Sequence, residues 1–258
     1  MMKYRKICLL LTAILLIFFT TNSCSRLFKK GRYIVATSPS TPPLVMLDAD
    51  KDIIGFDIDI VNQIALRMDM NVKIIPVLRT NLFYGLIDET YDIAIASITL
   101  PAEASEAENP EIEYSDPYLE IGEVIVLSED FGEYSGLDDL SGKIVGIEKG
   151  SDSKRVLVGR KGITIKEYSK IENAYEDIAV GKIDALSANL PNAVQTVHLS
   201  DEYNRILEIH PEPVTKKQYV IAVKSGNNIL LNKINSGIEK IKKDGSLQML
   251  IEKWFFTQ

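Results

Sequence analysis

At 258 residues, the chain is long enough for one large or two modest domains, and its composition is ordinary for a globular protein. Its formal net charge of −7 argues against nucleic-acid binding, because contacts to phosphates require basic patches. The sequence contains only two cysteines, so a framework of several disulfides is excluded.

The N-terminus has the pattern of an export signal rather than of a folded element. Three basic residues among the first six precede an apolar run from 7 to 19. This run is too short for a comfortable membrane span and has the right length for the hydrophobic part of a signal peptide. Cys8 lies inside the run, so cleavage after it would leave Cys24 without a partner for a disulfide.

The position of Cys24 resembles that in bacterial lipoprotein signals, in which the cysteine is lipidated and becomes the first residue of the mature protein. We therefore expect residues 1–23 to be a lipoprotein signal peptide, Cys24 to be the lipidation site and residues 24–31 to be a tether. Thr21 and Asn22 depart from the usual pattern, which has Leu and a small residue there. The alternative is an ordinary signal peptide followed by an incidental cysteine.

The first folded segment has the pattern of a βαβ unit. An apolar strand is expected from 33 to 37 and a second from 72 to 77, with a polar, proline-rich loop from 38 to 43. Between the strands, Gly55 makes a turn and Asp57 is a candidate helix N-cap. The apolar positions that follow have helical spacing: Val61, Ile64, Ala65 and Met68. This order predicts parallel strands joined by a right-handed crossover.

The α/β pattern continues, and polar residues follow its strands. A helix is expected from 81 to 90 and a strand from 91 to 97, after which Ser97 and Thr99 precede a proline. Ligands of open α/β sheets bind beyond the carboxyl ends of the strands, so this turn and the 38–43 loop are the first candidates for a binding site. The alternative is that both are ordinary polar loops.

A second α/β set begins at residue 143 and resembles the first. Its expected strands and helices lie at 143–147, from about 154, at 163–168, at 171–180 and at 183–187. Two similar lobes with polar strand ends suggest a cleft between them. The chain then returns to an expected strand at 218–223 and closes with two amphipathic helices, the second capped by Ser246.

Several segments, taken in order, resemble family 3 of the bacterial solute-binding proteins, which are the extracytoplasmic receptors of amino-acid ABC transporters. These segments are GFDIDIVNQIA, YSDPY, GKIDAL, YVIAVKSGN, LLNKINSGIEKIKKDGS and the final KWF. The resemblance implies a two-lobed α/β fold of the periplasmic-binding-protein type, with mostly parallel sheets flanked by helices. Lobe one would comprise 32–120 and 222–258, and lobe two 121–221, joined by crossings near Tyr118–Val124 and Tyr219–Val223.

The resemblance also implies a function. The protein would be an extracytoplasmic, lipid-anchored receptor that faces the periplasm or the outer face of the membrane. It would bind an amino acid or a related small polar solute in a cleft that closes on the ligand, and it would deliver this solute to an ABC transporter permease. We further expect a monomer that has no cofactor, no metal and no catalytic residues.

The family's ligand-binding residues, carried over position by position, match this chain only in part. The arginine that clamps the ligand carboxylate falls on Ala104, and residues 80–142 contain no Lys or Arg that could replace it. The aspartate that pairs with the ligand ammonium falls on Asn189. Ser38 stands where the family has an acidic residue, and Thr41 and Arg79 stand where it has aromatic residues. The family's hydroxyl donors are kept as Ser97, Thr99 and Ser151, whereas Asp152 replaces another hydroxyl.

These departures leave three hypotheses for the ligand, because a zwitterion in a closed cleft needs both of its charges paired. In the first, Arg79 takes a carboxylate from a new direction and Asp152 takes a cation. In the second, the ligand is not an α-amino acid and neutral donors hold it. In the third, Arg79 is a surface residue and the cleft binds weakly or not at all.

Two other classes of protein share the scaffold. One is a sensor or interaction lipoprotein that does not take part in transport. The other is a dehydratase-like enzyme, which would need a titratable group in the cleft, such as Glu103 or Asp152. His198 and His210 are expected at the surface, the latter in a loop, and neither has the spacing of metal ligands.

Overall fold

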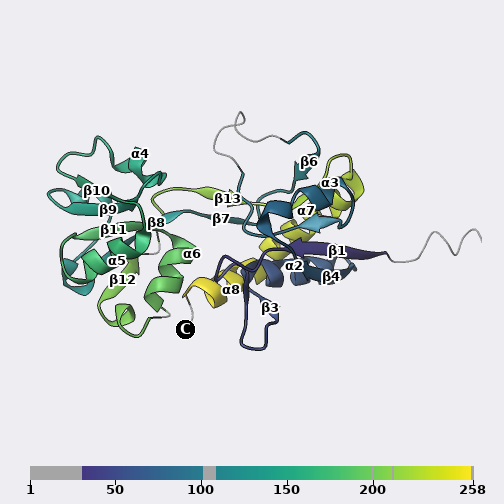
Figure 1. The fold of residues 1–258 in the computed structure, drawn as a ribbon, viewed down its shortest axis with the longest axis horizontal. Helices are drawn as coiled ribbons and strands as arrows, with labels where there is room; N and C mark the ends of the chain where they lie inside the picture. Colours follow the sequence, from purple (N-terminus) through teal and green to yellow (C-terminus); the bar gives the residue numbers. More distant parts are fainter. Residues whose placement is uncertain (1–30, 101–108, 199, 211, 257–258) are drawn as a thin grey trace, which may run out of the picture.

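The computed structural model shows two α/β lobes that are joined by a pair of strands, β7 and β13 (Figure 1). It describes residues 31–100, 109–198, 200–210 and 212–256. The predicted signal peptide, Cys24 and Ala104 lie outside these residues. Among the described helices, none has both the length and the apolar character needed to cross a membrane.

Lobe one is built on a five-stranded sheet with the order β4-β1-β5-β14-β6. Its strands are β1 (Arg32–Thr37), β4 (Asn71–Pro76), β5 (Ile93–Ala94), β6 (Ile112–Tyr114) and β14 (Ala222–Lys224). Strand β1 pairs in parallel with β4 and β5, whereas β14 pairs antiparallel with β5 and β6. The expected βαβ unit is therefore present, and the remaining strands make the sheet mixed.

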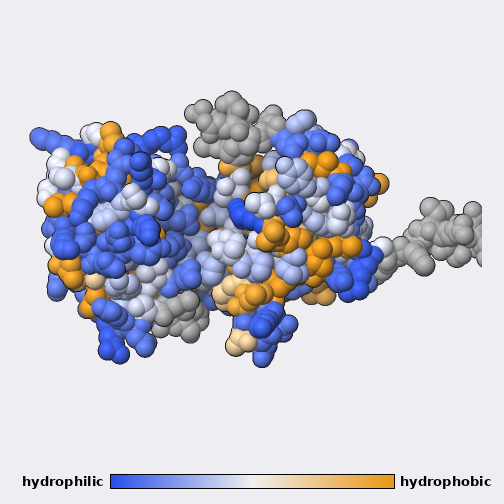
Figure 2. Space-filling model, in the orientation of Figure 1, coloured by the Kyte–Doolittle hydropathy of each residue, from blue (hydrophilic) through white to orange (hydrophobic). Residues whose placement is uncertain are grey.

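Helices and a short hairpin complete lobe one. They are β2 (Met46–Leu47), β3 (Ile53–Ile54), α2 (Phe56–Arg67), the 3₁₀ turn η1 (Arg79–Asn81), α3 (Tyr84–Ile87), α7 (Asn228–Lys243), α8 (Ser246–Ile251) and the π-helical turn η6 (Glu252–Phe256). Helix α2 packs against α7 and α8. Large apolar side chains gather on the visible face of this lobe, while lobe two is mostly hydrophilic there (Figure 2).

Lobe two is built on a second mixed sheet with the order β10-β9-β11-β8-β12. Its strands are β8 (Glu123–Ser128), β9 (Ile144–Glu148), β10 (Thr164–Tyr168), β11 (Ala185–Asn189) and β12 (Leu207–His210). Its helices and turns are η2 (Glu129–Phe131), η3 (Leu137–Leu140), α4 (Ser153–Leu157), α5 (Ile171–Ala179), α6 (Leu190–Ala193), η4 (Val194–His198) and η5 (Tyr203–Arg205). Strands β9, β10 and β11 are parallel, and β8 pairs antiparallel with β11 and β12.

The two lobes are connected by an antiparallel ladder of β7 (Leu119–Ile121) with β13 (Lys217–Tyr219). The two connecting segments touch closely, because a Cβ added at Gly122 would lie 2.0 Å from the carbonyl oxygen of Thr215. The two connecting strands lie at or next to the segments expected for the two crossings, 118–124 and 219–223. The lobe boundaries, at residues 120/121 and 221/222, stay a prediction.

Helix α2 begins two residues earlier than the sequence pattern indicates. Gly55 occupies the N-cap position, and Asp57 lies inside the first turn. Asp57 does not cap the helix because its carboxylate accepts hydrogen bonds from the Ser97 N–H and the Tyr118 hydroxyl, both at 2.7 Å. Long-range contacts thus take the side chain away from its expected local role.

Other expected elements are shorter or divided. The helix expected at 81–90 is reduced to η1 and α3, because the Tyr91 hydroxyl donates to the carbonyls of Asn81 and Leu82, which a continuous helix would use. The strand expected at 91–97 pairs only at Ile93–Ala94, and the one at 218–223 is split between β13 and β14. Gly245 rather than Ser246 is the N-cap of α8. His210 ends strand β12 and does not lie in a loop.

Candidate functional site

Ser97 lies three residues after β5 in lobe one, where the chain becomes polar. Its backbone has a φ of 53°, the left-handed region that non-glycine residues seldom adopt, and its N–H donates to Oδ2 of Asp57. The Ser97 side chain is buried, and its hydroxyl has no hydrogen-bond partner within the described residues. A strained residue with a free hydroxyl at a strand end is a candidate ligand-binding position.

The buried carboxylate of Asp57 stabilises this part of the chain through its hydrogen bond from the Ser97 N–H. Burial raises the pKa of Asp57 from 3.8 to about 7, and the hydrogen bonds from Ser97 and Tyr118 and the charge of Arg79 offset part of that rise. Tyr118 precedes strand β7. Asp57 therefore links the polar end of β5 to the first connection between the lobes.

Arg79 lies beside the same strand end. Its guanidinium donates to the carbonyl oxygens of Ala96, at 2.6 Å, and Ser97, at 3.5 Å. A guanidinium carries five N–H donors, so these two bonds leave donors for another acceptor. The structure thus brings two of the predicted residues, Arg79 and Ser97, into contact.

The other predicted residues of lobe one lie in separate places. Ser38 follows β1, is buried and contacts Ser40 through its hydroxyl at 3.5 Å. Thr41 forms an isolated bridge with Val45 in the next turn. Thr99 is exposed and bridges to Tyr219 of β13, which places it at the connection between the lobes.

In lobe two, Ser151 and Asp152 precede the short helix α4. Ser151 donates its hydroxyl to Oε2 of Glu123 at 2.7 Å. Asp152 forms ion pairs with Lys217 at 3.1 Å and Arg155 at 3.7 Å. Because two cations already neutralise Asp152, the structure does not favour the hypothesis that Asp152 receives a cation from the ligand.

Asn189, the last residue of β11, is directly opposite Glu123 in the antiparallel ladder with β8. Burial raises the pKa of Tyr219, and a hydrogen bond with the Asn189 side chain offsets part of that rise. Asn189 therefore connects the cleft side of lobe two to the second linking strand, β13.

Glu123 is a functional candidate that the sequence reasoning missed. It is only 5% exposed, and its carboxylate accepts hydrogen bonds from the Ser151 hydroxyl and from the N–H groups of Ser153, at 2.7 Å, and Asp152, at 3.3 Å. The available signal was a single acidic residue at the start of the apolar run EVIVL. Its partners could not be read from the sequence, because they lie about thirty positions further along the chain.

Two cavities adjoin some of these residues, and neither is lined by Arg79 or Ser97. The first, which we call the crossing pocket, has a volume of about 700 Å³ and is lined by Thr99, Leu100, Glu120, Asp152, Arg155, Val156, Thr215, Lys216, Lys217 and Gln218. The second, the lobe-two pocket, has a volume of about 380 Å³ and is lined by Glu123, Glu148, Lys149, Gly150, Ser151, Ile171, Ser187, Ala188, Asn189, Asn192 and Lys217. Lys217 lines both, so the two pockets adjoin at strand β13.

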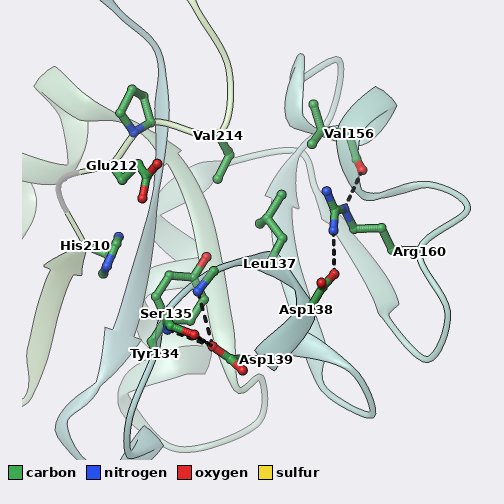
Figure 3. A pocket seen from close by; sticks show the side chains of 12 residues that line it. Tyr134, Ser135, Leu137, Asp138, Asp139, Val156, Arg160, His210, Glu212 and Val214 are labelled. Atoms are coloured by element: carbon green, nitrogen blue, oxygen red, sulfur yellow. Dashed lines mark hydrogen bonds and ion pairs between the residues drawn. The ribbon is translucent and has the colours of Figure 1, made fainter.

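A third cavity, of about 500 Å³, lies on lobe two between the 134–139 segment and the end of β12 (Figure 3). Its polar groups largely bond one another: Arg160 pairs with Asp138, and Asp139 accepts from Ser135. The residues predicted for ligand binding do not line this cavity. Thr99, Ser151, Asp152 and Asn189 line the crossing and lobe-two pockets instead.

Comparisons with known proteins give a consistent result. The family described as bacterial extracellular solute-binding proteins, family 3, matches residues 33–257. The L-cystine-binding protein TcyJ of Escherichia coli (strain K12) is 27% identical over 229 residues, which are 88% of this chain and 84% of that protein.

Solved structures of similar proteins differ in how well they superpose on this chain. The second substrate-binding domain of Lactococcus lactis GlnP in an open conformation has a TM-score of 0.77 at 22% identity, covering 89% of this chain and 97% of that chain. An ancestral arginine-binding protein bound to arginine has a TM-score of 0.54 at 31% identity, covering 87% and 98%. The better superposition therefore belongs to the less similar sequence.

Proposed function

This chain belongs to family 3 of the bacterial extracellular solute-binding proteins, and from that premise we propose that it binds an amino acid or a related small polar solute for an ABC transporter permease. One observation carries the proposal: the crossing pocket is lined by both lobes and by both connecting segments. A solute held there would contact lobe one through Thr99 and lobe two through Val156, and would therefore favour closure of the lobes.

The arrangement of the lobes supports a receptor without ligand. The chain superposes better on a domain in an open conformation than on a ligand-bound protein of higher sequence identity. Because lobe closure moves two rigid bodies, it lowers a global superposition score without changing either lobe. In the proposed cycle this structure is the open state that admits the solute.

On lobe one, we place the carboxylate of the solute near Arg79 and Ser97. Arg79 retains unused N–H donors, and the Ser97 hydroxyl is buried without a partner within the described residues. Ser38, which is buried, and Thr41 follow β1, and Thr99, Ser151 and Asn189 add neutral groups from the two pockets. Asp152 organises lobe two through Lys217 and Arg155.

We also propose that residues 1–23 direct export, that Cys24 carries a lipid anchor and that the mature receptor acts as a monomer without catalytic activity. Support comes from the basic and apolar pattern before Cys24 and from relatives that are binding proteins by name. The protein would then face the periplasm or the outer side of the membrane that holds its anchor.

A thermal-shift screen of the purified protein tests this function. The panel contains the amino acids, cystine, dipeptides, polyamines, purines and small carboxylates. A solute that binds only the folded state raises the melting temperature as its concentration passes the dissociation constant. We expect an α-amino acid to do so, and Arg79→Ala to weaken its binding by about 10- to 100-fold while Arg32→Ala, at the exposed start of β1, has no effect. A panel without any shift would contradict the proposal.

A further inference from the structure

We propose that Glu123 is the group in lobe two that receives the cationic nitrogen of the solute, so that the solute class is restricted to molecules with an ammonium group. This inference rests on the proposed function. It starts from the position of Glu123 at the lobe-two pocket and from the absence of a counter-ion beside its carboxylate within the described residues.

A buried carboxylate is costly unless hydrogen bonds or an opposite charge stabilise it. Glu123 is 5% exposed, and the cations of the pocket do not pair with it: Lys217 pairs with Asp152, and Lys149 is exposed at the rim. Three hydrogen bonds, from Ser151, Asp152 and Ser153, hold the carboxylate instead. The carboxylate is thus fixed in place, and it has no ion pair within the described residues.

The carboxylate still has capacity for another donor. Ionised carboxylates offer about four acceptor sites. Oε2 accepts from the Ser151 hydroxyl and the Ser153 N–H, while Oε1 accepts only the long bond from the Asp152 N–H, at 3.3 Å. An ammonium in the pocket could therefore donate to Oε1 without displacing an existing bond.

A second, independent observation points to a ligand in the same pocket. Ser187 is only 1% exposed, lines the pocket and has a hydroxyl without a hydrogen-bond partner within the described residues. Buried hydroxyls are normally satisfied, so an unpartnered one beside a cavity indicates a missing hydrogen-bond partner. Ser187 and Asn189 are two residues apart on β11 and share a face of the sheet with Glu123, which pairs with Asn189.

The same carboxylate excludes an anion from this part of the site. The donors at the start of α4, which are the Ser151 hydroxyl and the N–H groups of Asp152 and Ser153, all bond to Glu123. A ligand carboxylate placed there would compete for these donors and meet a like charge. The anionic part of the solute is thereby directed to Arg79 in lobe one, and the cationic part to lobe two.

The test compares Glu123→Gln with the double variant Glu123→Gln/Asn189→Asp. Position 189 is directly opposite 123, so the second change returns a carboxylate to the same face. Titration calorimetry with the solutes of the screening panel measures binding to wild type and variants. Glu208→Gln on the adjacent strand β12, exposed and remote from the pockets, is the matched control for removal of a charge.

We expect an amine-bearing solute to bind wild type, Glu123→Gln to weaken it by about 10- to 100-fold, and the double variant to recover most of the loss. Glu208→Gln should bind as wild type does. N-acetyl derivatives, which keep the carboxylate but remove the charged ammonium, should not bind. Circular dichroism confirms that each variant is folded before binding is measured.

The outcomes that overturn the inference are distinct. If the solute that binds wild type has no cationic nitrogen, or if Glu123→Gln leaves affinity unchanged, Glu123 is not the receiving group. If the double variant is as weak as Glu123→Gln, the role of Glu123 is only to hold the turn before α4. If no solute of the panel binds wild type, the proposed function fails and this inference fails with it.

Discussion

Two carboxylates, Asp57 and Glu123, are buried in the described part of the chain, and different surroundings stabilise them. Glu123 accepts three hydrogen bonds from the turn before α4. Asp57 accepts two, and its burial outweighs them, so that its pKa rises to about 7. Hydrogen bonds therefore hold the first side chain in place, whereas the second changes its charge near neutral pH.

Asp57 gives a prediction for the pH dependence of stability. Its pKa is higher in the folded protein than in the unfolded chain, so unfolding releases its proton between pH 4 and 7. The free energy of unfolding should therefore fall as the pH rises from 4 to 7, and ionisation of Asp57 should account for up to roughly 4 kcal/mol of this fall. Above pH 7, Asp57 should cause no further change with pH. Asp57→Asn, which cannot ionise, should show a smaller decrease than wild type.

Urea denaturation of wild type and Asp57→Asn at several pH values above 4 measures this difference. The range avoids the opposite effect of Asp244, whose pKa is lowered to about 2 by hydrogen bonds with Arg67 and Ser246, and which therefore loses stabilisation only at lower pH. Equal slopes for wild type and Asp57→Asn would show that Asp57 is not the titrating group.

At the level of elements, the ladder of β7 with β13 brings the two lobes together. It has only three residue pairs, and Gly122 follows it at the point where the chain enters β8. The absence of a side chain at Gly122 lets the Thr215 backbone approach. The close approach of the two connections therefore depends on one residue without a Cβ.

Gly122→Ala tests this dependence. Its Cβ would lie 2.0 Å from the Thr215 oxygen, so the connections must move apart. We expect a loss of about 1–3 kcal/mol in the free energy of unfolding, the usual cost of overpacking, and weaker solute binding. Gly136→Ala is the matched control, because a Cβ there meets no atom within 4 Å. If thermal unfolding of the two variants is the same, the packing at Gly122 is not important for stability.

At the scale of the whole molecule, the two sheets lie in separate bodies and the polar strand ends of both adjoin the linking strands. The crossing pocket lies at this junction, and the lobe-two pocket adjoins it. Residues of both lobes line the crossing pocket, so one solute held there can contact both lobes. The N-terminal segment that precedes β1 would keep this assembly near a membrane.

The anchor gives a prediction for the whole protein. Cys24→Ala should abolish incorporation of a labelled fatty acid and release the protein from the membrane fraction of bacterial cells, because the anchor would be lost. Cys8→Ala, inside the apolar run, should remain labelled. Labelled Cys24→Ala protein would show that another residue carries the lipid, and unlabelled wild type would favour the ordinary signal peptide.

Several elements could be predicted from the sequence because their signals are local. The alternation and helical spacing of apolar residues predict β1, α2, β4, β9, α5 and α7 close to their observed bounds. The order of these elements, together with the resemblance to family 3, predicts two lobes. Arg79 and Ser97 are both candidates from the sequence, and the structure brings them into contact, while their role in binding stays a prediction.

Other features were decided by contacts between distant parts of the chain. Asp57 is withdrawn from the N-cap by Ser97 and Tyr118, and the helix expected at 81–90 is shortened by the Tyr91 hydroxyl. Hydrophobic periodicity is a local property, so the order of residues predicted most of the helices and strands and, together with the resemblance to family 3, two α/β lobes. Charge pairing depends on which side chains the fold brings together, so the ion pair of Asp152 with Lys217, and the lack of one at Glu123 within the described residues, could be seen only in the folded protein.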